Sequence, residues 1–129
     1  MSYKSELGRV RGLGSAKHGA HHWIVQRGTA IANIFLLVWL VVSLFMLPNF
    51  GYEAVAAWLS RPLVAVPMLL LLLNVFWHIR LGWQVLIEDY IHDHGLKVIA
   101  LIALNFYTFG LTALSVFAVA KLAFTGVPA

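Results

Sequence analysis

Three long stretches of this 129-residue sequence contain no charged side chain, at 28–47, 62–77 and 98–120. An α-helix rises about 1.5 Å per residue, so roughly 20 apolar residues cross the ~30 Å hydrocarbon core of a bilayer. The second stretch can continue in the same helical pattern towards Ile87. We therefore predict an all-α membrane protein with three transmembrane helices. The predicted parts are a cytoplasmic or interfacial segment 1–27 and an anchor 28–129 with spans at about 28–47, 62–87 and 98–120.

The composition supports a membrane protein and excludes several classes of site. Hydrophobic residues make up 61% of the chain and charged residues only 11%, which is far from the composition of a soluble domain. The absence of cysteine excludes a disulfide scaffold, an iron–sulfur site on this chain's own thiolates and a cysteine zinc site. The net charge of +4 comes mostly from residues near the N-terminus, which favours a topology signal over nucleic-acid binding.

The distribution of basic residues predicts the orientation of the chain. One side of the membrane would carry Lys4, Arg9, Arg11, Lys17, Arg27 and Lys97, and the other Arg61 and Lys121. The positive-inside rule then places the N-terminus and the second connection in the cytoplasm and the C-terminus in the periplasm. The first residues resemble no signal peptide and no long presequence is visible, so we expect a bacterial inner membrane rather than a mitochondrial one.

His78 is an ionisable residue inside a predicted span, and such residues are functional candidates by default. A buried imidazole can be an axial ligand of a haem iron, and Gly82 one turn later would let a flat macrocycle approach the backbone. The alternative is a histidine that hydrogen-bonds a neighbouring helix, and spacing alone favours it. Arg80 points nearly opposite His78 and is interpreted as a snorkelling side chain or a surface contact.

Asp89 and Tyr90 lie at the cytoplasmic end of the second predicted span. Asp89 follows His78 by eleven positions, close to three full helical turns at about 100° per residue, so both face the same side. The tyrosine hydroxyl could donate a hydrogen bond to a quinone carbonyl, and the neighbouring carboxylate could relay protons towards it. An ordinary solvated helix end is the alternative, and these residues alone favour it.

Two further groups of polar residues have alternative interpretations. The segment 17–27 holds three histidines and two cations next to Trp23, which suits anionic-lipid contact, an anion clamp or, with least support, a transition-metal cluster. Each span also contains one asparagine. These residues, Asn33, Asn74 and Asn105, are predicted to form hydrogen bonds between helices.

Three motifs occur together along the chain. They are Arg9-Val10-Arg11-Gly12-Leu13-Gly14-Ser15-Ala16-Lys17, residues 21–27 followed by Thr29-Ala30, and His78 with Asp89-Tyr90 eleven positions later. This combination resembles the small hydrophobic membrane-anchor family of succinate dehydrogenase, respiratory complex II. The resemblance extends from about residue 8 to the end of the third span, and the N-terminal motif looks most like the alphaproteobacterial and mitochondrion-related branch.

The resemblance implies a subunit that is not catalytic alone. In this family a flavoprotein oxidises succinate, and an iron–sulfur subunit passes the electrons to ubiquinone. By that resemblance, His78 is one axial ligand of haem b, and the partner anchor, the cytochrome b subunit, supplies the other. Tyr90 would hydrogen-bond ubiquinone with Asp89 beside it, and Arg27 and His21 would meet the haem propionates. His22, His92 and His94 match no family role.

Two other functions remain open from the sequence. A fumarate reductase anchor would run the reaction backwards with menaquinone, and this chain discriminates poorly between the two directions. The second alternative is a membrane scaffold subunit without a cofactor. Phospholipid is expected around the spans in all three cases, and nucleic acid in none.

Overall fold

The computed structural model describes residues 17–126, which form four α-helices. They are α2 (Lys17–Phe45), α3 (Tyr52–Leu59), α4 (Pro62–Tyr90) and α5 (His94–Thr125). Within this range α2, α4 and α5 are long and apolar enough to cross a membrane. The predicted all-α architecture with three spans is confirmed, and the chain is a multi-pass membrane protein.

Local sequence signals account for the helix ends. Pro62 occupies the first turn of α4, where the missing N–H would have no helical partner in any case. Asp93 caps α5, and its carboxylate accepts a hydrogen bond from the Leu96 N–H at 2.7 Å. Gly126 follows α5 with a φ of 72°, a conformation that suits glycine at a helix C-terminus.

The long helices extend beyond the uncharged stretches from which the spans were predicted. Helix α2 begins at Lys17 rather than at residue 28, so part of the predicted surface segment 1–27 is helical. At about 1.5 Å per residue the 29 residues of α2 measure roughly 43 Å, which exceeds the ~30 Å hydrocarbon core. A helix satisfies its own backbone hydrogen bonds, so it can continue into the headgroup layer, where polar side chains are tolerated.

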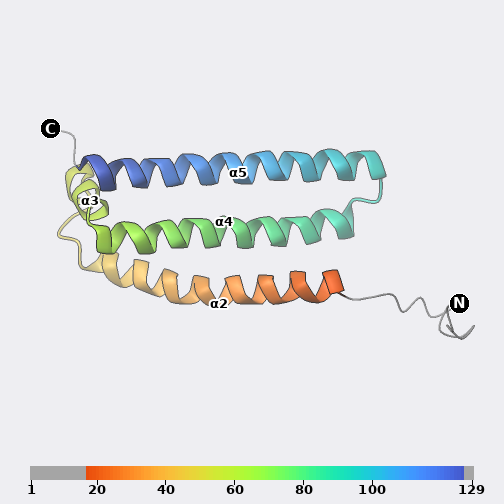
Figure 1. Ribbon diagram of the computed structural model, residues 1–129, viewed down its shortest axis with the longest axis horizontal. Coiled ribbons are helices and arrows are strands. Elements are labelled where there is room, and N and C mark those ends of the chain that lie inside the picture. The colour runs from red at the N-terminus through yellow and green to blue at the C-terminus, as the bar shows by residue number, and fades with distance from the viewer. Residues whose placement is uncertain (1–16, 127–129) are drawn as a thin grey trace, which may run out of the picture.

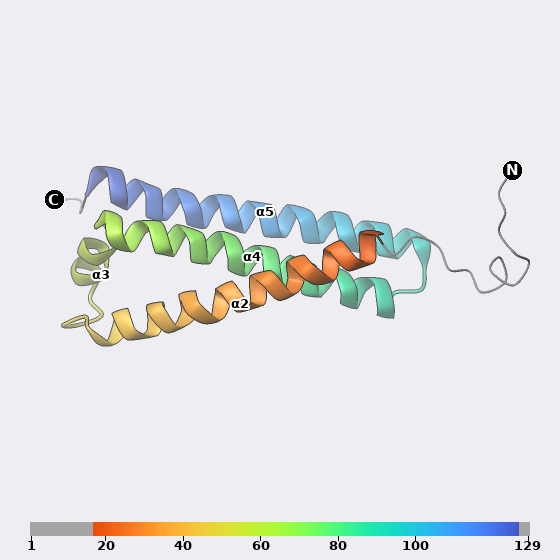
Figure 2. The same ribbon diagram turned by 60° about the horizontal axis from the view of Figure 1, so that its bottom comes forward.

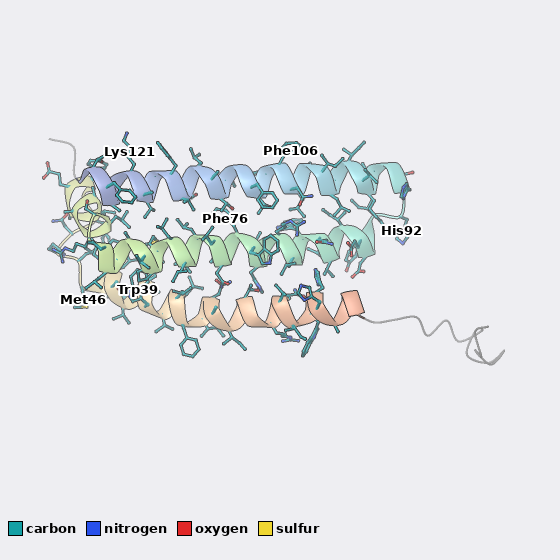
Figure 3. The ribbon with its side chains drawn as sticks, viewed as in Figure 1. Trp39, Met46, Phe76, His92, Phe106 and Lys121 are labelled. Carbon is teal, nitrogen blue, oxygen red and sulfur yellow. The ribbon has the colours of Figure 1, made fainter. Side chains whose placement is uncertain are left out.

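The connection between the first two spans contains a helix that the sequence reading missed. Residues 48–61 lie between the predicted spans 28–47 and 62–87, and within them Tyr52–Leu59 form α3. The Trp58 ring is buried and stacks on Trp39 of α2, with ring centroids 6.2 Å apart and planes inclined by 18°. Figure 3 shows Trp39 at this end of α2. Aromatic stacking therefore fixes the short helix against the end of the bundle.

The three long helices lie in a row, with α4 between α2 and α5 (Figure 1). In the part of the chain that the structure describes, no Cα atom of α2 lies within 8 Å of a Cα atom of α5. Helix α2 crosses α4 obliquely, whereas α4 and α5 run side by side (Figure 2). The beginning of α2 and the α4–α5 connection lie at one end, and α3 lies at the other with the end of α5 (Figure 1).

Most large apolar side chains point outward from this row of helices. Phe106, for example, projects from α5 away from α4 (Figure 3) and is 79% exposed. The buried apolar residues are few and are Ala56, Trp58, Ala65, Leu71, Leu81 and Val119. So much exposed apolar surface requires lipid or a partner's helices around it.

Asparagine side chains link the helices, as the sequence predicts. The Asn74 amide on α4 donates to the Asn33 side-chain oxygen at 2.7 Å and to the Thr29 carbonyl at 2.8 Å, both on α2. Asn105 on α5 accepts a hydrogen bond from Arg80 Nε at 2.7 Å. Helices have little hydrophobic reason to associate in lipid, so such polar contacts help to set which faces meet.

Replacing Asn74 with leucine is expected to destabilise the packing of α2 on α4 by about 1–2 kcal/mol, because two interhelical hydrogen bonds are lost. The measurement is the free energy of unfolding of the purified protein in mixed detergent micelles. Leu70→Ala, at an exposed position of the same helix, is the control and should cause a smaller loss. Equal losses for the two variants would contradict the role of Asn74.

Candidate functional site

His78 lies on the face of α4 that contacts α2, where it is half-buried. Its Nδ1 atom is 3.0 Å from the hydroxyl oxygen of Thr29 on α2. The same hydroxyl is 2.9 Å from the carbonyl oxygens of Val25 and Gln26, one turn earlier in α2. Among the described residues, His78 therefore does bond to a neighbouring helix, and it does so through Nδ1 alone.

A hollow of about 260 Å³ opens beside His78. Its other lining residues all come from α2 and are Trp23, Gln26, Arg27 and Ala30. The structure thus brings together His78 and Arg27, two residues that the sequence assigned to one site. The Arg27 guanidinium lies 5.5 Å from the centre of the Trp23 ring, and this cation–π contact holds the cation at the mouth of the hollow.

His21 is not among the residues that line this hollow. It lies on α2 six positions before Arg27, and its side chain is exposed. The structure brings Arg27 to His78, and it leaves His21 at the polar beginning of the helix.

The surface of α4 next to His78 is open where Gly82 lies. A Cβ atom added at Gly82 would meet no atom within 4 Å. The row of helices therefore leaves free space beside Gly82, and among the described residues only α2 and α4 line the hollow beside the imidazole. A planar group larger than the 260 Å³ hollow fits here only if a second protein closes the other side.

The residues that line the hollow are of the kinds that hold a haem. The hollow combines an imidazole, a guanidinium and the apolar side chains of Trp23 and Ala30, which are the groups that a haem iron, its propionates and its ring prefer. Among residues 17–126 no cluster of three or more histidine, cysteine, aspartate or glutamate side chains could hold a bare metal ion. The donor set suits a prosthetic group with one ligand from this chain.

Asp89 and Tyr90 lie at the end of α4, away from the hollow. Both side chains are exposed, Tyr90 by 76%. In the preceding turn the Lys97 ammonium donates to the Glu88 carbonyl at 3.2 Å, so α5 is tied to α4 at this level. The phenol and the carboxylate thus stand together on the outer surface at the end that also holds His92 (Figure 3).

Arg80 does not have the surface role that the sequence reading gave it. Besides its bond to Asn105, its guanidinium lies 5.1 Å from the centre of the Trp77 ring and 3.5 Å from the Gln84 oxygen. It is half-buried and joins α4 to α5. The residue opposite His78 on α4 is therefore part of the helix packing.

A larger, apolar groove of about 700 Å³ lies between α4 and α5. Its lining includes Phe76, Trp83 and Tyr107 but no histidine or charged residue. Its chemistry suits an apolar chain, and it offers no group for a prosthetic metal.

Sequence reasoning missed the position of Thr29 beside His78. Thr29 belongs to a motif on which the resemblance rests, but nothing in the sequence indicates that it contacts a residue 49 positions away. The part of the motif at 9–16, with Arg9 and Arg11, lies outside the described residues, as does Lys4.

Comparison with known proteins agrees with this architecture. Residues 1–112 match the family described as succinate dehydrogenase/fumarate reductase transmembrane subunit. Succinate dehydrogenase hydrophobic membrane anchor subunits are similar to this chain in Rickettsia bellii (33% identity, 82% of this chain and 85% of the relative) and in Rickettsia conorii (35%, 74% and 76%). The corresponding protein of Coxiella burnetii is 23% identical over 65% of this chain and 73% of its own length. No solved structure matches the chain. With its three spans and the match over residues 1–112, the chain belongs to the succinate dehydrogenase/fumarate reductase transmembrane subunit family.

Proposed function

We propose that this chain is the hydrophobic membrane anchor of a succinate:ubiquinone oxidoreductase, respiratory complex II. In this role it contributes one ligand to a haem b, forms part of the ubiquinone-reduction site and docks the flavoprotein and iron–sulfur subunits. The observation that carries the proposal is the hollow in which His78 of α4 and Arg27 of α2 meet, in a chain of this family.

His78 is the proposed axial ligand. The Nδ1 atom contacts Thr29, and Nε2 has no hydrogen-bond partner among the described residues, so one nitrogen is free to bind iron. Bound between the anchors, the haem supplies one-electron transfer within the membrane. The second ligand is assigned to the partner anchor, the cytochrome b subunit, because His78 is the one histidine in the hollow.

Arg27 is the proposed partner of the haem propionates. A propionate is an anion, and a guanidinium at the edge of the hydrocarbon core can donate two parallel hydrogen bonds to it. The location of Arg27 on the wall of the hollow supports this role. His21 is proposed as a second, more peripheral propionate contact.

Tyr90 and Asp89 are the proposed contribution of this chain to the ubiquinone site. The phenol can donate a hydrogen bond to a quinone carbonyl, and the adjacent carboxylate can support the phenol and pass protons from water. Ubiquinone has a long apolar tail, so its head must react where lipid and water meet. The exposed end of α4 provides that boundary.

The open side of the helix row supports a partner with its own transmembrane helices. Three helices in a row cannot enclose a macrocycle, and His78 with Gly82 borders free space. We assign this side to the cytochrome b subunit and the end with Tyr90 to the iron–sulfur subunit and, beyond it, the flavoprotein. Phospholipid covers the remaining apolar surface.

The charges at the two ends of the bundle support a cytoplasmic N-terminus and a periplasmic C-terminus in a bacterial inner membrane. Arg27 and Lys97 lie on the side of the α2 N-terminus and the α4–α5 connection, whereas Arg61 and Lys121 lie on the side of α3. The first side carries Asp89 and Tyr90, so the proposed quinone site faces the cytoplasm.

The proposal is tested by isolating the complex in mild detergent through an affinity tag on this chain. We expect the flavoprotein and iron–sulfur subunits to co-purify and the dithionite-reduced minus air-oxidised spectrum to contain a sharp b-type α band. Partners without the α band would refute the haem role but not the anchor role. If neither is present, the anchor proposal fails and a cofactor-free scaffold takes its place.

A further inference from the structure

Three polar atoms lie within hydrogen-bonding distance of the Thr29 hydroxyl, which has only one hydrogen to donate. Its oxygen lies 2.9 Å from the Val25 carbonyl, 2.9 Å from the Gln26 carbonyl and 3.0 Å from His78 Nδ1. Carbonyl oxygens can only accept, and a threonine in a helix commonly donates back to the carbonyl three or four residues earlier. If the hydroxyl donates its hydrogen to one of these carbonyls, the Thr29 oxygen can accept a hydrogen bond from His78 Nδ1.

The direction of this bond decides which nitrogen of His78 can bind a metal. A neutral imidazole carries its hydrogen on one nitrogen and a lone pair on the other. If Nδ1 donates to Thr29, the lone pair is on Nε2. In the opposite arrangement, with Nδ1 accepting from the hydroxyl, Nε2 would carry the hydrogen and could not be a ligand.

We propose that Thr29 is a positioning residue that holds His78 in the tautomer with Nδ1 protonated and aims Nε2 at the haem iron. This inference rests on the proposed haem role of His78. Metal-binding histidines commonly donate their other N–H to a fixed acceptor, which orients the ring and raises its basicity. Here the acceptor is a side chain on a different helix, so the orientation of the ring depends on how α2 packs against α4.

A second contact fixes the position of Thr29 along the axis of α4 relative to His78. Asn74 lies one turn before His78 on α4, and its amide donates to the backbone carbonyl of Thr29 at 2.8 Å and to Asn33 at 2.7 Å. Side chain and backbone of Thr29 are thus both bonded to α4. A variant that changes only the hydroxyl leaves the Asn74 contact in place, which separates the effect on His78 from the effect on helix packing.

The experiment uses Thr29→Val, which keeps the shape of the side chain and removes the hydroxyl, and Thr29→Ser, which keeps the hydroxyl. Thr112→Val is the matched control, because the Thr112 hydroxyl also donates to the carbonyl four residues earlier, at 2.7 Å, and among the described residues it forms no hydrogen bond to another helix. All three are made in the full complex. Haem retained per complex and the midpoint potential of the haem are measured, together with the set of subunits that co-purify.

Thr29→Val is expected to weaken haem retention by roughly 10- to 100-fold. Because a donated Nδ1–H bond favours the oxidised iron, we also expect a tenfold loss of preference for that state, a rise in midpoint potential of about 59 mV. Thr29→Ser and Thr112→Val should match the parent complex. Unchanged haem content and potential in Thr29→Val would overturn the inference, and so would equal losses in Thr29→Ser. Haem retained in His78→Ala would instead refute the ligand role itself.

Discussion

Replacing His78 with alanine is expected to abolish the b-type α band of the purified complex. The variant removes the one imidazole in the hollow between α2 and α4, and a single remaining ligand from the partner would not hold the haem in its two-ligand state. The Thr29 hydroxyl keeps the carbonyls of Val25 and Gln26 as partners, so the change leaves no unsatisfied group on α2. The measurement is the reduced-minus-oxidised spectrum, normalised to the flavin of the same preparation.

The control for this variant is His92→Ala, in the exposed connection between α4 and α5, which should leave the spectrum unchanged. The set of co-purified subunits shows whether the complex assembles. An assembled His78→Ala complex with a full complement of haem carrying two histidine ligands would mean that another residue binds the iron. The hollow would then have no assigned ligand.

Replacing Tyr90 with phenylalanine is expected to lower succinate-dependent ubiquinone reduction by roughly a hundredfold or more. The substitution removes the hydroxyl and retains the ring, so the end of α4 keeps its shape. Electron transfer from succinate to a water-soluble dye should remain unchanged, because the dye takes electrons before they reach the membrane. The ratio of the two rates is the quantity to measure.

Tyr52→Phe provides a matched control at the opposite end of the molecule. Tyr52 is exposed to a similar degree and begins α3, which has no part in the proposed quinone site. Equal ubiquinone reduction by Tyr90→Phe, Tyr52→Phe and the parent complex would remove Tyr90 from the quinone site and favour the scaffold alternative. Assays with ubiquinol and menaquinol, each with fumarate as the acceptor, address the direction of the reaction.

The sequence predicted the spans well because the bilayer imposes a simple requirement. A stretch such as 98–120 without charge is long enough to cross and has no competing explanation, and it lies within α5. The lengths of the helices were underestimated because a charged residue was taken to mark the end of a span. Tyr90, which ends α4 and is exposed, shows that a helix continues where side chains can reach water.

The elements that the sequence reading missed depend on contacts between distant residues. Helix α3 follows two breakers, Pro48 and Gly51, and its position depends on the stacking of Trp58 on Trp39 and on its packing against α4 and α5. Arg80 was read as a surface residue because its partner Asn105 is on another helix. In both cases the residue type was visible in the sequence and its partner was not.

The candidate site, too, could be predicted from the sequence only in part. The free-energy cost of an ionisable side chain inside the membrane is enough to single out His78. The resemblance to the family supplied the possible roles of Arg27 and Tyr90. The meeting of His78 and Arg27 in one hollow and the contact with Thr29 require the crossing of α2 over α4. No periodicity within either helix contains that information.

The order of the helices in the row also bears on how the protein is made. Among the described residues, the interhelical hydrogen bonds of α2, through Thr29 and Asn33, all come from α4, and no Cα atom of α5 lies within 8 Å of one of α2. Helix α2 leaves the ribosome first, and its buried Asn33 has no partner until Asn74 has entered the bilayer. The hydrogen bonds between α2 and α4 require no residue of α5. The half of the proposed haem site that belongs to this chain thus requires the packing of the second span on the first and no contact with the third.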